Sequence, residues 1–266
     1  MNRSVIAALV PLVLMGCSVS SSGGQSADAS STDMVAIDGG LVWVGTDNDT
    51  YSDAPIKQVV IPTFRIDAFE VTNSQFADCV SAGKCPEPGI KGFDQIPDYY
   101  ESDTYADAPV AYVTWYQAGA YCAWQGKRLP TELEWEAAAR GADGNIYPWG
   151  DAEPTCDYAH YGECNQVREA GTGPMAVGSL EMGATEGGVY DLAGNMAEWT
   201  ADWYDDDLYN KFVDGEMPIR PEAGRSKVIR GGSWYCEADR MLSFKREAFP
   251  PVYRAGNVGF RCAESI

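Results

Sequence analysis

The segment from Val228 to Ala263 constrains the fold most, because it combines a two-glycine corner with aromatic, cysteine and arginine residues. Val228-Ile229-Arg230 is a β-branched run that predicts a strand. Gly231-Gly232 follows, and glycine allows backbone angles or close approaches that a side chain would forbid. Pro250-Pro251 then interrupts the segment, and residues 258–262 predict a final strand. The pattern predicts a strand that enters a tight corner, a polar and aromatic stretch, and a closing strand.

The composition indicates a loop-rich globular protein. The 266 residues are 45% hydrophobic, which suffices for one large domain or two small ones. The 28 glycines, 15 prolines and 12% aromatic content favour short elements held together by rings and argue against a helical bundle. A net charge of −20 argues against a nucleic-acid partner and against electrostatic attachment to anionic lipid.

The N-terminus is typical of a secretory leader. Residues 1–16 carry one positive charge and an apolar run that is too short to span a bilayer as a stable helix. Gly16 before Cys17 resembles a bacterial lipoprotein cleavage box, which implies that Cys17 becomes the lipid-modified N-terminus. Residues 18–33 are rich in Ser and Gly and predict a flexible tether. We therefore expect a leader over 1–16, a lipidated tether over 17–33 and a domain over 34–266.

Local patterns predict the following elements. Residues 34–46 alternate apolar and polar side chains across a Gly-Gly pair, which predicts a hairpin. Residues 59–69 predict strands with a break at Pro62. Helices are predicted over 74–82, over 115–125 with Thr114 as N-cap, and from Thr131, where Glu134 completes a capping box.

Several longer motifs point to a family. They are RGGSW at 230–234, NVGFRCA at 257–263, EVTNSQF at 70–76, AYCAWQGKRLPTELEWEAAARG at 120–141 and YPWG at 147–150. Together they resemble the formylglycine-generating enzyme, or sulfatase-modifying factor, family. The resemblance covers residues 34 to 263 and implies a single α+β domain with a C-type-lectin-like fold, short strands, few helices and much irregular chain.

Eight cysteines occur, and outside the cytoplasm thiols pair. With Cys17 set aside, Cys79–Cys85 and Cys156–Cys164 are the simplest local disulfides, because each pair brackets a short loop. The family resemblance would join Cys122 to Cys262. Cys236 is then left unpaired, in the segment where the family carries out its chemistry.

The resemblance also identifies a candidate catalytic centre. The family's oxidase binds Cu(I) between two cysteines five residues apart and uses O₂ to convert a substrate cysteine to formylglycine. Cys236 occupies the first position, with Ser233 close by, but the second position is Met241. A thioether is soft, yet it bears no charge and cannot become a thiolate. Cys236 is therefore a buried structural thiol, half of a Cys-Met copper site, or a partner in an intermolecular disulfide.

A candidate calcium site lies in GVYDLAGNMAEWTADW, residues 188–203. Calcium binds mixtures of carboxylate and carbonyl oxygens. The resemblance implies that Asp191 and Glu198 contribute side chains and that Gly194 and Met196 contribute carbonyls. The alternative is a capped turn without an ion.

The remaining charged residues restrict the chemistry. His160 is the only histidine, which excludes a three-histidine iron centre and a His-dependent hydrolase triad. We expect His160 at the surface and residues 202–207 in a solvated loop. Four arginines are expected to form salt bridges in this acidic chain, namely Arg240, Arg246, Arg254 and Arg261.

Two classes of function follow. The first is an oxidase acting on a protein cysteine, supported by Cys236 and Ser233. The second, which Met241 favours, is a non-catalytic binding or scaffold module with a protein or peptide ligand, tethered by lipid in the cell envelope outside the cytoplasm. Ser18 after Cys17 indicates the outer membrane if the cell has one, because the usual retention signal at that position is acidic.

Overall fold

The computed structural model describes Met1 and residues 33–48, 50, 51, 53–167 and 173–266. Residues 2–16 of the predicted leader, Cys17 and all but the last residue of the predicted tether lie outside these described residues. Within the described ranges, no helix combines the length and the apolar character needed to cross a bilayer.

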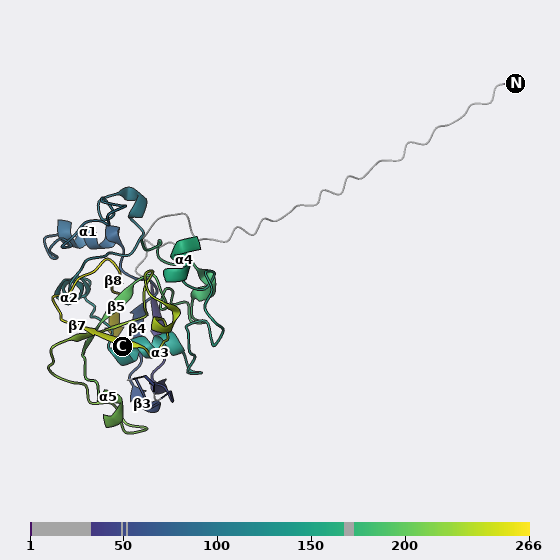
Figure 1. The fold of residues 1–266 in the computed structure, drawn as a ribbon, viewed down its shortest axis with the longest axis vertical. Coiled ribbons are helices and arrows are strands. Elements are labelled where there is room, and N and C mark those ends of the chain that lie inside the picture. The colour runs from purple at the N-terminus through teal and green to yellow at the C-terminus, as the bar shows by residue number, and fades with distance from the viewer. Residues whose placement is uncertain (2–32, 49, 52, 168–172) are drawn as a thin grey trace.

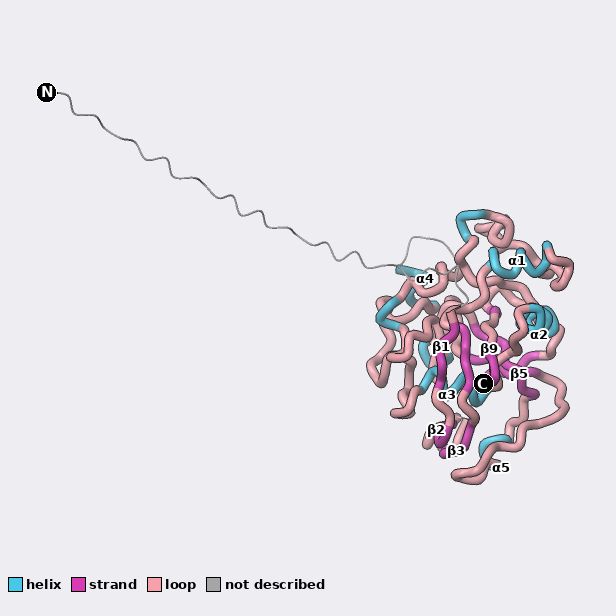
Figure 2. The backbone as a smooth tube through the Cα atoms, turned by 180° about the vertical axis from the view of Figure 1, so that it is seen from behind, coloured by secondary structure: helices cyan, strands magenta, loops and turns pink. Residues whose placement is uncertain are grey.

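The strands form three small sheets joined by long loops, and Figure 2 shows that loops make up most of the trace. Among the strands of the described residues, β5–β8 is the only parallel pair. In spatial order the sheets are β1 (Met34–Ile37), β4 (Phe64–Asp67) and β9 (Ala263–Ser265); β2 (Gly40–Val44) and β3 (Lys57–Ile61); and β7 (Arg246–Phe249), β6 (Lys227–Arg230), β5 (Ala197–Trp203) and β8 (Val258–Gly259).

The helices are short and sit around the sheets, with α1 at one end of the domain and α5 at the other (Figure 1). The three helices predicted from sequence are confirmed, and each begins with a capping box, at Thr72, Thr114 and Thr131. The helices are α1 (Asn73–Ser81), α2 (Trp115–Trp124), α3 (Glu132–Arg140), α4 (Gly162–Val167) and α5 (Leu208–Lys211), with 3₁₀ turns η1 (Asp103–Tyr105), η2 (Glu181–Gly183) and η3 (Ala238–Arg240). The predicted α+β class is confirmed.

The predicted hairpin over 34–46 is wrong. β1 pairs with β4 and β2 pairs with β3, so residues 34–44 and 57–67 form one antiparallel ribbon that bends in the middle. At the bend, a Cβ on Gly39 would lie 2.4 Å from the backbone of Pro62 and Thr63. Gly39 therefore serves close packing between two segments, Gly40 adopts a positive φ of 107°, and the pair does not reverse the chain.

Helix α3 is buried along its whole length, including its charged residues. The Arg246 Nε donates to Glu132 at 2.6 Å, and the Arg230 Nη2 donates to Glu136 at 2.9 Å. The Tyr209 hydroxyl donates to the same Glu136 carboxylate. Buried charges are tolerated when they are paired and hydrogen-bonded in this way. The network joins α3 to β6 and β7, and β6 leads directly into the candidate site.

The described part of the chain contains three disulfides, and they are the three expected pairs. Cys79–Cys85 and Cys156–Cys164 close short loops. Cys122–Cys262 joins α2 to the segment before β9 across 140 residues, and both of its cysteines are fully buried. Cys236 is the free cysteine among the described residues.

Candidate functional site

The Gly-Gly corner after β6 brings the candidate thiol back over the chain. Gly231 and Gly232 have φ angles of 93° and 66°, in the left-handed region. A Cβ on Gly231 would lie 3.0 Å from the Trp135 ring. A Cβ on Gly232 would lie 2.9 Å from the Cys236 Sγ and 3.0 Å from the Arg240 carbonyl. Both positions therefore require glycine, and the sulfur of Cys236 packs against Gly232.

Ser233 and Cys236 lie together, as the sequence predicts. The Ser233 N–H donates to the Cys236 Sγ at 3.0 Å, and the Cys236 N–H donates to the Ser233 carbonyl at 3.0 Å. The Ser233 hydroxyl is buried and accepts from Asn257. Burial raises the pKa of the Cys236 thiol; the Ser233 N–H opposes this rise, and the negative charge of Glu247 adds to it. The thiol is therefore held in its protonated form, which is a poor nucleophile and a poor metal ligand.

Met241 follows η3 and is 0% exposed. It packs in a cluster with Tyr147, Tyr161 and Cys164, and Cys236 packs against the same cluster. The thioether thus fills the hydrophobic core beside the thiol. An enclosed thioether in place of the second thiolate does not fit a tight Cu(I) site. The copper role predicted for Cys236 and Met241 stays a prediction that this environment disfavours.

The candidate calcium segment is a strained turn packed on His160. Asp191, Gly194 and Asn195 have φ angles of 58°, 83° and 53°. The Asn195 N–H donates to the His160 carbonyl at 2.8 Å, and a Cβ on Gly194 would approach that carbonyl to 2.5 Å. The prediction that His160 lies at the surface is wrong. Its side chain is 4% exposed, and its Nε2 lies 2.9 Å from the Gly173 carbonyl.

The two carboxylates predicted to bind calcium have different partners. The Asp191 Oδ2 accepts from the Gly178 N–H at 2.7 Å. Glu198 is fully buried and accepts from the Arg261 guanidinium at 2.7 to 3.0 Å and from the Trp135 indole at 2.9 Å. Burial raises the pKa of Asp191 to about 6, and the negative charge of Glu198 adds to the rise. The charges of the two side chains thus act on each other.

Glu70 is a third carboxylate at this turn, and the sequence assigned it no role beyond a family motif. Its Oε1 accepts from the Met196 N–H at 2.9 Å and its Oε2 from the Asn195 amide at 2.6 Å. Burial raises its pKa well above the ordinary range, and the charges of Asp191 and Glu198 raise it further. The pattern EVTNSQF could have suggested a buried acid, since Glu70 directly precedes an apolar residue and a helix cap.

The residues at this turn include donor types that calcium binds. Three carboxyl groups lie near one buried guanidinium, that of Arg261, and burial raises the pKa of Glu70 so that this acid keeps its proton. Carboxylate and carbonyl oxygens are the donors that calcium prefers. Among the described residues no group of three or more His, Cys, Asp or Glu side chains is arranged to hold a metal. The predicted set uses two side chains and two carbonyls, of Gly194 and Met196, and so stays a prediction.

Three of the four arginines form the expected salt bridges. Arg240 pairs with Glu247, Arg246 with Glu132 and Arg261 with Glu198. The solvated loop predicted over 202–207 is wrong at Asp202. This residue is buried at the end of β5, and it accepts from Arg220 and from the Glu132 N–H, which explains why it leaves solvent.

Comparison with known proteins identifies the family of the chain. Residues 20–266 match the "Sulfatase-modifying factor enzyme 1-like domain". The chain belongs to the sulfatase-modifying factor family. Within the family it is 34% identical to the formylglycine-generating enzyme of Thermomonospora curvata, over 86% of this chain and 92% of that protein. It is 30% identical to the inactive C-alpha-formylglycine-generating enzyme 2 of Mus musculus, over 97% of this chain and 94% of that protein.

A third relative is much longer. The chain is 31% identical to the serine/threonine-protein kinase Pkn1 of Chlamydia trachomatis over 88% of this chain, but it spans 38% of that protein's length.

Solved structures show the same fold. PvdO from Pseudomonas aeruginosa superimposes with a TM-score of 0.70 and 26% identity, over 88% of this chain and 94% of that one. Treponema denticola variable protein 1 superimposes with a TM-score of 0.67 and 24% identity, over 88% and 95% of the two chains. The family frame is thus conserved in shape while its sequence varies widely.

We predict that Gly232→Ala destabilises this family member by about 3 kcal/mol, since the new Cβ adds steric overlap with Cys236 and Arg240 to the cost of a left-handed backbone. Gly188 is a matched control, because its φ is 84° and nothing lies within 4 Å of an added Cβ. Gly188→Ala should cost about 1 kcal/mol. Urea unfolding measures both, and equal losses would contradict the close packing at Gly232.

Proposed function

We propose that this protein is a lipid-anchored, extracytoplasmic binding or scaffold module of the sulfatase-modifying factor family, and that it does not generate formylglycine. The observation that carries the proposal is Met241. It stands where the family's second copper-binding cysteine would lie, it is fully buried, and it packs in the core beside a protonated Cys236.

Similarity to relatives does not separate the two functions. The chain resembles a protein named formylglycine-generating enzyme at 34% identity and one named inactive C-alpha-formylglycine-generating enzyme 2 at 30%. Identities so close together leave the decision to the residues of the site. The alternative function is therefore the oxidase, with Cys236 and Ser233 as its catalytic residues.

The surface at the corner suits a protein or peptide ligand. Tyr235 is 74% exposed directly beside Cys236, and its ring meets Trp234 edge to face. Trp234 in turn packs edge to face against Phe93. Rigid aromatic side chains supported from below are typical anchors of protein interfaces. A ligand at Tyr235 would also come within reach of the Cys236 thiol.

Copper binding and turnover test the proposal. We predict that the protein, titrated with Cu(I) under reducing conditions, takes up no stoichiometric copper and produces no aldehyde on a cysteine peptide in the presence of O₂. The physical reason is the missing second thiolate. Stoichiometric copper together with aldehyde, detected by mass spectrometry, would overturn the proposal and establish the oxidase.

Substitutions at Met241 test the reason itself. Met241→Cys should raise Cu(I) affinity at least about tenfold, because a second thiolate becomes available. Serine is close to cysteine in size but has no thiol, so Met241→Ser should leave the Cu(I) affinity unchanged. Both variants open a similar space in the core, so unfolding measurements confirm that they are compared in equally folded states.

We further propose that Asp191, Glu198 and the carbonyls of Gly194 and Met196 bind a structural calcium ion. Without the ion, the raised pKa of Asp191 means that the folded state keeps a proton that the unfolded state loses, so stability falls as the pH rises from about 4 to about 6. Calcium at about 1 mM should therefore raise the unfolding temperature by about 5 °C or more near pH 7.5, and by much less near pH 5, where the proton competes.

The matched variants for calcium are Asp191→Ala and Asp78→Ala, since Asp78 is an exposed acid on α1. Asp191→Ala should remove the calcium response and Asp78→Ala should keep it, as followed by thermal unfolding with magnesium as the control ion. An equal calcium response in both variants would refute the site.

The lipid anchor rests on the sequence around Cys17. We predict that Cys17→Ser abolishes labelling of the protein by radioactive palmitate and releases it from the membrane fraction. Unchanged labelling or unchanged sedimentation would contradict the anchor. Replacement of Ser18 by Asp separates the choice of membrane from lipidation itself, because it changes only the residue after the lipidated cysteine.

A further inference from the structure

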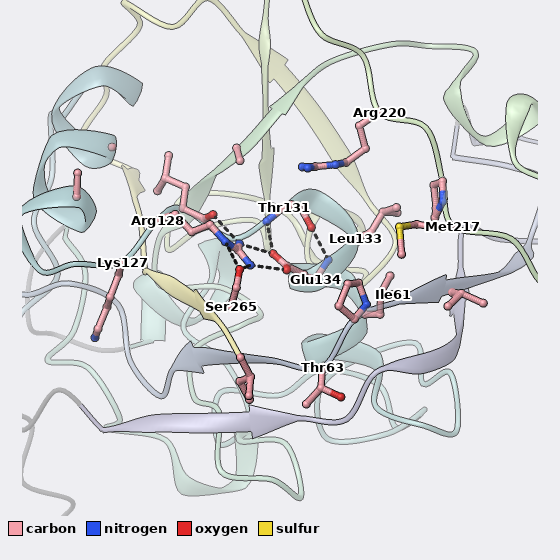
Figure 3. Close-up of a pocket in the computed structure, with 18 of the residues that line it drawn as sticks. Ile61, Thr63, Lys127, Arg128, Thr131, Leu133, Glu134, Met217, Arg220 and Ser265 are labelled. Carbon is pink, nitrogen blue, oxygen red and sulfur yellow. Dashed lines mark hydrogen bonds and ion pairs between the residues drawn. The ribbon is translucent and has the colours of Figure 1, made fainter.

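A cavity of about 660 Å³ lies between α2, α3, β3 and the segment 217–220 (Figure 3). Cavities of this size hold small organic molecules. None of its described lining residues belongs to 231–241 or to 191–198, the range of the predicted calcium ligands, so it is separate from both candidate sites. It serves neither the proposed scaffold surface nor the alternative oxidase.

The body of the cavity is apolar. Ile61 from β3 and Leu133 from α3 form one part of the lining, and Met217 lies across from them (Figure 3). Met217 is 63% exposed, although it is a large apolar side chain in a folded domain. An apolar surface that remains open beside a cavity is typical of a ligand-binding groove.

The carboxylate of Glu134, which lines the cavity, already accepts several hydrogen bonds. Both oxygens of Glu134 accept from Arg128 at 2.7 Å, and the Oε2 also accepts from the Thr131 N–H at 2.8 Å. Arg128 also donates to Ser265. These groups form one closed network along the cavity wall (Figure 3). A cationic ligand would therefore compete with Arg128 for the same carboxylate.

The guanidinium of Arg220 can donate further hydrogen bonds. Its side chain is 45% exposed and extends across the cavity toward Thr131 and Arg128 (Figure 3). Its Nη1 donates to the buried Asp202 at 2.8 Å, which uses one of the five N–H donors of a guanidinium that lines the cavity. The free hydrogen-bonding groups of the cavity are thus donors, which match an anion.

A buried lysine adds positive charge at the same end. The Lys227 Nζ lies 4.1 Å from the ring centre of Trp115, and Trp115 lines the cavity. Burial lowers the pKa of Lys227 to about 8; the charge of Asp202 raises it and the charge of Arg220 lowers it further. The cations of Lys227 and Arg220 therefore share the carboxylate of Asp202, although the whole chain has a net charge of −20. A second negative charge placed on Arg220 would balance the set.

We propose that this cavity binds an apolar molecule with one carboxylate, of the straight-chain fatty-acid class, with the carboxylate on Arg220 and the chain over Ile61, Leu133 and Met217. The apolar body supplies most of the affinity, and the arginine distinguishes the acid from uncharged and cationic molecules of the same length.

The test uses the full mature chain with Cys17→Ser, secreted behind a cleavable leader, so that no detergent competes for the cavity. Octanoate, decanoate, 1-octanol and octylammonium are titrated by calorimetry. We expect saturable binding of one acid molecule per chain, tighter for decanoate than for octanoate. The alcohol should bind about tenfold more weakly than the acid, and the ammonium ion more weakly still.

Two pairs of variants locate the ligand. Arg220→Gln should weaken decanoate binding about tenfold and leave octanol binding unchanged, whereas Arg225→Gln on the same exposed loop should alter neither. Gly119 lines the cavity and an added Cβ there meets nothing within 4 Å, so a larger side chain grows into the open space. Gly119→Phe should abolish decanoate binding, and Gly119→Ala should retain it with the same fold.

The following results would overturn the proposal. They are no binding by the folded chain, equal binding of acid and alcohol, decanoate binding that survives Gly119→Phe, or binding of an acidic apolar peptide in place of decanoate. Each variant is checked by its thermal unfolding, so that loss of folding is not taken for loss of the ligand.

Discussion

The buried pair of Arg261 and Glu198 is the interaction on which the centre of the domain depends. Arg261 also donates to the carbonyls of Asp67, Ala68 and Tyr190, so one guanidinium holds together the end of β4, the start of the candidate calcium segment and β5. An unpaired charge at this depth would cost several kcal/mol, so neither partner can be changed alone. The arrangement also fixes the position of Glu198, whose charge, together with burial, raises the pKa of Asp191 and of Glu70.

Much of the fold could be predicted because its signals are local. The capping boxes at Thr72, Thr114 and Thr131 mark helix starts within four residues, and the family motifs determine the order of the elements. The pairing of 34–44 with 57–67 could not be predicted from alternation, because an alternating run does not say which strand it joins. In the sequence, Gly39 is typical of a turn. Its role in close packing is visible only from the approach of Pro62 and Thr63.

The candidate site, like the fold, could be predicted from the sequence only in part. Ser233, Cys236 and Met241 could be placed together from their spacing and the family motif. The burial of His160 and Asp202 could not, since both depend on partners far away in the chain, the turn at Gly194 and the side chain of Arg220. The protonated state of Cys236 is likewise a property of its enclosure. A family motif thus identifies which residues meet, while their chemistry depends on burial and charge that no short motif encodes.

The Cys122–Cys262 bond and the strand β9 together set the timing of folding. β4 lies between β1 and β9, and α2 is covalently joined to the residue before β9. The first sheet therefore lacks its third strand until synthesis reaches Ser265, some 200 residues after β4 has emerged. Until then β4 has an unpaired edge on the side that β9 later takes. A chain of this design must keep that strand edge from pairing with other chains until its last residues are available.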